Sequence, residues 1–225
     1  MKHIPRIYVP DIGDVISISD EQKHHLINVL KCRDDAIVHV FNARMGEWKA
    51  RLKIAGHGKR YDVQLLPQRC VVEPYESAEK ALAFCIIKPH RLMIMLEKCC
   101  ELGIMRFFPI ISDYTNEQSI NVKRCHYAIV SAIEQSGRIH LPVLEEPRKL
   151  SDFCAEYRQR VVICDGNGES LQINQDDVFL IGPEGGFSPE EQNLFYGMRK
   201  YKLCDGILRS ETAAIAAATA LFIVS

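Results

Sequence analysis

A segment rich in glycine and proline follows a short apolar run in the last quarter of the chain. Ile181 ends the apolar run, and Gly182-Pro183-Glu184-Gly185-Gly186 comes directly after it. Ser188 is the expected N-cap of a helix, with Pro189 at its first position and Glu191 completing a capping box. Loops of this kind, at the carboxyl ends of parallel strands, bind ligands because glycines let backbone N–H groups come close. The segment therefore predicts a strand, a ligand-binding loop and a helix start.

The alternative is a tight connection whose glycines only supply positive φ angles. The spacing matches neither G-x-x-x-x-G-K-[ST], which is absent from the chain, nor G-x-G-x-x-G. A P-loop is therefore excluded, and both a triphosphate hydrolase and an ordinary NAD enzyme are disfavoured.

Two further segments combine polar side chains with a turn. Arg209-Ser210-Glu211-Thr212 follows Gly206 and leads into an alanine-rich helix that is predicted to start at about Glu211. Glu134-Gln135-Ser136-Gly137-Arg138 stands at the end of another predicted helix. Both have a plain structural explanation, since alanine is the best helix former and Gly137 can serve as a C-cap. The polar residues are nevertheless the kinds that line a binding pocket.

The elements around these segments alternate between strands and helices. Continuous apolar runs predict buried parallel strands at 81–87, 106–111, 160–165 and 177–181. Helical patterns lie at 91–102, 123–135, 150–158 and 189–199, and at the alanine-rich end of the chain. Such alternation predicts an α/β fold with a parallel sheet.

The first 70 residues differ from the rest. Strand patterns cover 37–43, 47–54 and 61–66, with turns at Arg44-Met45-Gly46 and Gly56-His57-Gly58. A helix is expected between Asp20, its N-cap, and Leu30, and a linker between Pro67 and Pro74. We therefore expect a small, barrel-like β domain over 1–72 and an α/β domain over 73–225.

Charge and cysteine usage limit the function further. The net charge of −1 argues against a polyanionic partner, but residues 1–72 carry 12 Lys+Arg against 8 Asp+Glu and residues 73–225 carry 16 against 21. A basic module is thus joined to an acidic one. The nine cysteines contain no C-x-x-C pair, so we expect neither zinc or another metal nor disulfides. No apolar stretch is long enough for a membrane span, and the pattern is typical of a cytoplasmic protein.

Several of these segments together resemble one known family. They are Gly182–Phe187, Ile207–Ala213, Glu134–Arg138, Lys98–Gly103 and His25–Lys31. The chain resembles the RsmE family of the SPOUT superfamily, whose members methylate N3 of a uridine in 16S ribosomal RNA. The resemblance implies a SPOUT-type parallel sheet with a C-terminal trefoil knot, preceded by a PUA-like β-barrel that binds RNA. It also implies a homodimer and the cofactor S-adenosylmethionine.

Site residues follow from the resemblance. Cofactor contacts are expected from Cys164, Ile181, Gly182, Pro183, Glu184, Gly185, Gly186, Leu203, Ile207, Leu208 and Thr212. Removal of the uridine N3 proton spreads charge onto the flanking carbonyl oxygens, so Arg138 and Arg209 are candidate stabilisers of that charge. Glu134 or Glu211 is the candidate proton acceptor. RNA contacts are expected from Arg6, His24, His25, Lys31, Arg33, Lys88, Arg91 and Lys98.

Departures from the family pattern keep two alternatives open. Cys204 stands at a customary glycine, Gly206 at a customary arginine and Met93 at a customary acidic residue. One alternative is a methyltransferase of another RNA, such as tRNA. The other is a non-catalytic protein that binds RNA or assists assembly.

Overall fold

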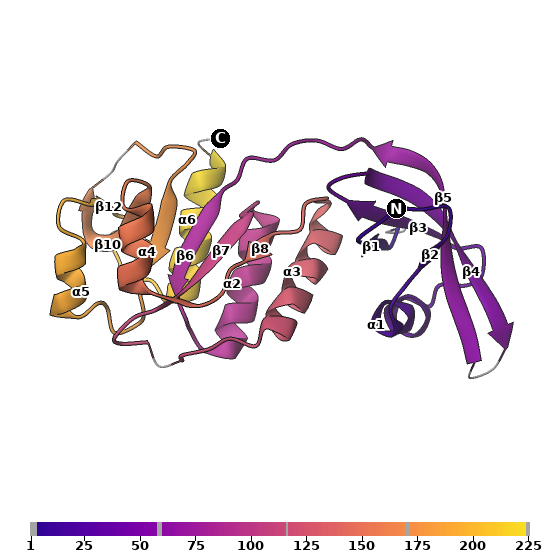
Figure 1. The fold of residues 1–225 in the computed structure, drawn as a ribbon, viewed down its shortest axis with the longest axis horizontal. Helices are drawn as coiled ribbons and strands as arrows, with labels where there is room; N and C mark the ends of the chain where they lie inside the picture. Colours follow the sequence, from indigo (N-terminus) through magenta and orange to yellow (C-terminus); the bar gives the residue numbers. More distant parts are fainter. Residues whose placement is uncertain (1–3, 58–59, 116, 170–171, 224–225) are drawn as a thin grey trace. The chain divides into compact units, whose positions relative to one another are not determined.

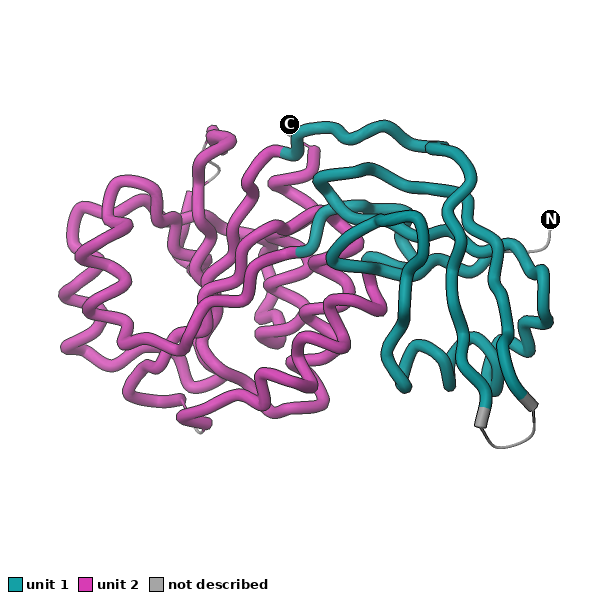
Figure 2. The backbone as a smooth tube through the Cα atoms, turned by 45° about the vertical axis from the view of Figure 1, so that its right-hand side comes forward, with its two compact units in different colours: residues 1–77, 133–141 teal, residues 78–132, 142–225 magenta. Residues whose placement is uncertain are grey.

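The computed structural model describes residues 4–57, 60–115, 117–169 and 172–223. Contacts divide the chain into two compact units (Figure 2). Unit 1 holds Met1–Ser77 together with Ile133–Leu141, and unit 2 holds Ala78–Ala132 and Pro142–Ser225. Unit 1 therefore includes a segment from far along the chain, which no local sequence pattern indicates.

Unit 1 is built on a curved five-stranded sheet with the strand order β1-β3-β4-β5-β2 (Figure 1). The strands are β1 (Arg6–Tyr8), β2 (Ile16–Ser17), β3 (Ile37–Asn42), β4 (Gly46–His57) and β5 (Arg60–Val72). β1 is parallel to β3, and the other pairs are antiparallel. Val38, Val40, Leu52 and Leu65 form part of its core. The predicted β-rich domain is confirmed. The predicted turn at 56–58 includes Gly58, which lies outside the described residues.

The linker expected to begin at Pro67 is wrong, because β5 continues through this residue to Val72. Pro67 pairs with Ala50 where the register of the β4–β5 ladder shifts. Proline lacks an N–H group and is tolerated in a sheet at such irregularities. A proline therefore marks a bulge here and does not end the strand.

The helical segment of unit 1 begins one residue earlier than expected. Ser19, not Asp20, is the N-cap of α1 (Asp20–His24), since its hydroxyl accepts from the Gln22 N–H and the Gln22 side chain accepts from the Ser19 N–H. Asp20 is the first helical residue, where its charge complements the helix dipole. A π-helix, η1 (His25–Val29), follows and buries Leu26. The segment is thus two short helical elements.

A buried arginine joins the sheet of unit 1 to the segment 133–141. The Arg6 guanidinium pairs with Glu47 at 2.7 Å and donates to the carbonyl oxygens of Ile133, Glu134 and Arg138 at 2.7, 3.0 and 3.1 Å. Its side chain is only 9% exposed. The expectation that Arg6 contacts RNA is therefore wrong, because its donors are used inside unit 1 and are shielded from solvent.

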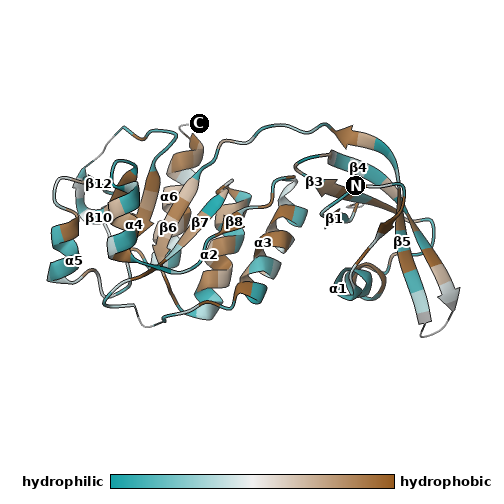
Figure 3. Ribbon diagram, viewed as in Figure 1, coloured by the Kyte–Doolittle hydropathy of each residue, from teal (hydrophilic) through white to brown (hydrophobic). Residues whose placement is uncertain are grey.

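Unit 2 contains a parallel sheet with the order β12-β10-β11-β6-β7-β8, and β9 also pairs with β7. The strands are β6 (Ala81–Cys85), β7 (Arg106–Ile111), β8 (Val143–Leu144), β9 (Arg148–Lys149), β10 (Val161–Glu169), β11 (Val178–Ile181) and β12 (Arg199–Tyr201). The predicted α/β fold with a parallel sheet is confirmed. The central strands are apolar along their length (Figure 3), because residues that point to either face are buried.

Helices cover the sheet of unit 2. They are α2 (Pro89–Glu101), α3 (Val122–Ser136), whose last four residues belong to unit 1, α4 (Leu150–Tyr157), α5 (Pro189–Leu194) and α6 (Ser210–Ile223). α2 packs against α6, which also contacts β6 and β11, while α4 contacts α5 and β7. α5 ends at Leu194 and not at Arg199 as predicted. Gly197 has a φ of +72° and Arg199 begins β12, so the chain turns into the sheet instead.

We expect Arg6→Ala to lower the free energy of unfolding by about 3 kcal/mol, because it leaves the buried Glu47 carboxylate without its charged partner. Arg44→Ala is the control. Arg44 pairs with Asp11 at side-chain exposures of 72% and 68%, and its loss should cost less than about 1 kcal/mol. Urea unfolding of the two variants measures both free energies of unfolding. Equal losses would show that the buried pair stabilises the fold no more than the exposed pair does.

Candidate functional site

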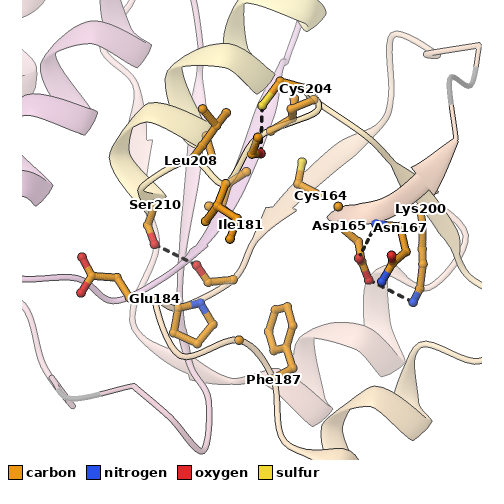
Figure 4. A pocket seen from close by; sticks show the side chains of 18 of the residues that line it. Cys164, Asp165, Asn167, Ile181, Glu184, Phe187, Lys200, Cys204, Leu208 and Ser210 are labelled. Carbon is orange, nitrogen blue, oxygen red and sulfur yellow. Dashed lines mark hydrogen bonds and ion pairs between the residues drawn. The ribbon is translucent and has the colours of Figure 1, made fainter.

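A pocket of about 440 Å³ lies in unit 2, beyond the carboxyl ends of β10 and β11 (Figure 4). Its walls include residues 164–167 in the second half of β10, the loop after β11 and the segment 203–208 before α6. Its volume is in the range of about 300–1,000 Å³ that small-molecule sites have. The position is the one where open parallel sheets bind ligands.

The loop after β11 is tightly folded. The Gly182 carbonyl oxygen accepts a hydrogen bond of 3.0 Å from the Ser210 hydroxyl at the start of α6 (Figure 4). A Cβ atom on Gly182 would lie 2.8 Å from the ring of Phe187. Gly186 has a φ of +72°, and its N–H donates to the Pro183 carbonyl oxygen at 3.0 Å. The sequence thus uses glycine where a side chain would clash or strain the backbone.

The helix start after this loop is as predicted. The Ser188 hydroxyl accepts from the Glu191 N–H, and the Glu191 carboxylate accepts from the Ser188 N–H at 3.0 Å. Pro189 is the first residue of α5. The loop therefore ends at a fixed N-cap.

One wall of the pocket is polar. The Asp165 carboxylate accepts from the Asn167 N–H at 2.9 Å and from Lys200 Nζ at 3.1 Å (Figure 4). The Asn167 N–H, helped by the Lys200 ammonium, holds the pKa of Asp165 below its usual range. Glu184 adds a second carboxylate. These groups suit the hydroxyl or cationic parts of a ligand.

The rest of the wall is apolar. It includes Ile181, Phe187, Leu203 and Leu208. Burial raises the pKa of the Cys164 thiol, so this side chain also lines the pocket as a neutral group. An apolar wall facing a few fixed polar groups suits a small organic molecule with a planar part and charged ends.

Family models match both parts of the chain. A model described as an RNA methyltransferase domain matches residues 74–222, and one described as an RNA methyltransferase PUA domain matches residues 18–66. The chain belongs to the RNA methyltransferase family. The resemblance stated from the motifs is thereby confirmed.

Relatives within this family match the chain over most of its length. The ribosomal RNA small subunit methyltransferase E of Buchnera aphidicola (subspecies Schizaphis graminum) is 30% identical and covers 98% of this chain and 96% of its own. The enzyme of the same name from Rickettsia conorii is 29% identical over 88% of this chain and 85% of its own.

Solved structures agree in fold. The ribosomal RNA small subunit methyltransferase E of Neisseria gonorrhoeae, bound to S-adenosylmethionine, has a TM-score of 0.84 at 25% identity and covers 99% of this chain and 98% of its own. A methyltransferase structure from Legionella pneumophila with bound S-adenosylmethionine has a TM-score of 0.83 at 26% identity, with 97% of both chains covered. The α/β domain and the PUA domain of the family are thus both present.

The structure brings most of the predicted cofactor residues of this RNA methyltransferase family member into one pocket. The predicted residues that line it are Cys164, Ile181, Gly182, Pro183, Glu184, Gly186, Leu203, Ile207 and Leu208. Gly185 does not line it, and lies instead in a smaller hollow with Lys88 and Tyr114. Thr212 is exposed on α6 and does not line it either.

Sequence reasoning missed the polar wall. Asp165, Asn167 and Lys200 were not among the predicted site residues, and neither was Gln192. The segment Asp165-Gly166-Asn167-Gly168 continues β10 beyond its buried residues Val161–Ile163. Polar and glycine residues at that position are a signal that could have indicated the site.

The candidate catalytic residues are divided between the two units. Arg209 is exposed directly before α6, and Glu211 lies in the first turn of α6. Glu134 and Arg138 belong to unit 1. There Glu134 Oε1 accepts from the Tyr8 N–H at 3.0 Å, so this carboxylate has a structural contact of its own.

The candidate RNA-binding cations also differ in their surroundings. Lys98 pairs with Glu97 and Glu101 at 2.7 and 2.9 Å, which raises its pKa. Arg91 pairs with Glu184 and Glu211. The exposed candidates are His24, Lys31, Arg33 and Lys88, while His25 is half-buried.

The nine cysteines of this family member all lie in the described residues and form no disulfide there, and five of them are buried, namely Cys85, Cys99, Cys100, Cys125 and Cys154. Over residues 4–57, 60–115, 117–169 and 172–223, no group of three His, Cys, Asp or Glu side chains is placed to hold a metal ion. Within the same ranges, no helix has the length and apolar character needed to cross a membrane.

Glu134→Gln tests the electrostatics of the contact with Tyr8. Burial raises the pKa of Glu134 above its usual value of 4.5, and the Tyr8 N–H and Arg6 offset this only in part. The folded chain then binds more protons than the unfolded chain, so this carboxyl costs stability as the pH rises past about 4.5. We expect Glu134→Gln to be more stable than the wild type at pH 7, with the difference vanishing below about pH 4.

Unfolding at a series of pH values measures this difference. Glu156→Gln is the control of opposite sign, because Arg148 lowers the pKa of the exposed Glu156. That variant should lose stability relative to the wild type as the pH rises through the same range. The assignment would be contradicted if the wild type became more stable relative to Glu134→Gln as the pH rises.

Proposed function

We propose that the protein is an S-adenosylmethionine-dependent methyltransferase that modifies N3 of a uridine in 16S ribosomal RNA of the small subunit. The observation that carries the proposal is the pocket behind the Gly182–Gly186 loop, in a chain with an RNA methyltransferase domain. Relatives named ribosomal RNA small subunit methyltransferase E, one solved with S-adenosylmethionine, support both the substrate and the cofactor.

The pocket fits this cofactor chemically. The apolar side chains of Ile181, Leu203 and Leu208 suit an adenine ring, and the glycines of the loop let its backbone come close to the ring. The carboxylates of Asp165 and Glu184 suit ribose hydroxyls or the ammonium group. When bound, S-adenosylmethionine supplies a methyl group on a positively charged sulfur.

The uridine must lose its N3 proton as N3 bonds to the methyl carbon, while the methyl–sulfur bond breaks and S-adenosylhomocysteine leaves. The proton goes to a carboxylate, for which Glu211 and Glu134 are the candidates. Arg209 and Arg138 would stabilise the negative charge on the uracil oxygens. Holding the two reactants in line supplies much of the remaining acceleration.

RNA binding belongs to residues 1–72 in this proposal, and methyl transfer to residues 73–225. The candidates for phosphate contacts are His24, His25, Lys31 and Arg33 in this first part of the chain, and Lys88 would add a contact from the second part. The proposal further includes a homodimer acting in the cytoplasm on the small ribosomal subunit. The trefoil knot also stays a prediction.

Nucleoside mass spectrometry of 16S ribosomal RNA from cells that lack the gene tests the reaction. We expect 3-methyluridine to disappear from this RNA and to return when the gene is restored. Retention of 3-methyluridine would eliminate the proposed reaction. Loss of a methylated nucleoside from tRNA instead would identify a different substrate.

Gly182→Ala tests the cofactor site. A Cβ at position 182 would meet the Phe187 ring at 2.8 Å, so the loop must shift, and we expect S-adenosylmethionine binding to weaken at least about tenfold. Gly185→Ala is the matched control. A Cβ at position 185 would lie 3.5 Å from the Tyr114 side chain, an ordinary van der Waals distance, and outside the pocket. Calorimetric titration measures both. An equal effect of the two substitutions would argue against this placement of the cofactor.

A further inference from the structure

One arginine connects the loop of the pocket with the first turn of α6. Arg91, in the first turn of α2, forms an ion pair with Glu184, and its Nε lies 3.7 Å from Oε1 of Glu211. The side chains of Arg91 and Glu211 are 20% and 14% exposed. Because solvent screens these two groups only partly, the attraction between Arg91 and Glu211 is stronger than that of a surface pair.

The ion pair between Arg91 and Glu184 holds the middle of the Gly182–Gly186 loop, whose two ends are fixed by other contacts. Ser210 holds the Gly182 carbonyl oxygen, and the N-cap at Ser188 fixes the other end. Glu184 lies between these anchors, is 50% exposed and lines the pocket. Its position therefore determines where this wall of the pocket stands.

The carboxylate of Glu211 also depends on Arg91. Oε2 of Glu211 is buried and has no hydrogen-bond partner in the described part of the chain. A buried carboxylate that lacks a full set of partners depends strongly on the cation that remains. Without Arg91, two carboxylates that now share one guanidinium would repel each other.

We propose that Arg91 is a positioning residue for the cofactor: it holds Glu184, and with it the Gly182–Gly186 loop, in the conformation that forms the pocket. The inference rests on the proposed function, because it takes S-adenosylmethionine as the ligand. It replaces the expectation that Arg91 contacts RNA phosphates. A guanidinium matched by two carboxylates adds no net positive charge to a surface.

Titration of S-adenosylmethionine into the RNA-free protein tests the proposal. We expect Arg91→Ala to raise the Kd about tenfold or more, since the loop loses its central anchor. Arg91→Lys keeps the charge but not the planar fork, so it should recover part of the affinity. His90→Ala is the matched control, because His90 is exposed on the same helical turn, and its Kd should equal that of the wild type.

Two double variants separate positioning from general damage. Glu211→Gln in the Arg91→Ala background removes one of the two unmatched charges and should restore affinity, which a merely misfolded variant would not show. Arg91→Ala should add little to the loss caused by Glu184→Ala, because both remove the same pair. Full additivity of these two losses would overturn the proposal.

The outcomes also separate this inference from the proposed function. A wild-type protein that does not bind S-adenosylmethionine overturns the proposed function itself. A wild type that binds it, with a Kd that Arg91→Ala leaves unchanged, overturns only the role of Arg91. Weaker RNA binding by that variant, with a smaller salt dependence, would then return Arg91 to the phosphate contacts.

Discussion

The pocket depends on one carboxylate buried at the start of α5. Glu191 Oε2 accepts from the Ser188 N–H and its Oε1 accepts from the Asp113 N–H at 2.9 Å, while the Ser188 hydroxyl donates to the Asp113 carboxylate at 2.5 Å. Hydrogen bonds to a charged acceptor at a helix N-terminus are among the stronger ones in proteins. Because Asp113 follows β7 and Ser188 precedes α5, this network fixes the end of the glycine loop to the segment after β7, a strand that is separated from β11 by β6.

A loop held at both ends has little freedom, and this explains its composition. β11 sets its first residue, and the cap at Ser188 sets its last. Phe187 packs edge-on against Phe195 at 4.7 Å between ring centroids, which brings its ring over Gly182. The chain can then close the turn only with a positive φ at Gly186. Glycine is thus required by packing as well as by turn geometry, and the backbone becomes a wall of the pocket.

The sequence predicts the features that depend on neighbours within a few residues. The capping box of Ser188 and Glu191 is such a feature, and so are the continuous apolar strands. Contacts between distant residues are missed. The sequence predicts that Arg6 is a surface cation. In the structure it contacts Glu47, 41 residues away, and the Ile133 carbonyl oxygen, 127 residues away. β12 is missed for the same reason, since its three residues form a strand only because β10 lies beside them.

Contacts within the folded chain also change how many positive charges remain available to a partner. By sequence, the first 72 residues carry an excess of four positive charges. Of the candidate cations, Arg6 is neutralised by Glu47 inside unit 1, and Lys98 is matched by two carboxylates on its own helix. The exposed positions Lys31 and Arg33 follow η1 on a turn where Lys31 has a φ of +55°. In the proposed function, an RNA that contacts only these remaining candidates would gain little from general attraction, since each phosphate contact contributes separately to the salt-dependent affinity. The shape of the RNA and the bases that enter the site must then supply most of the selectivity.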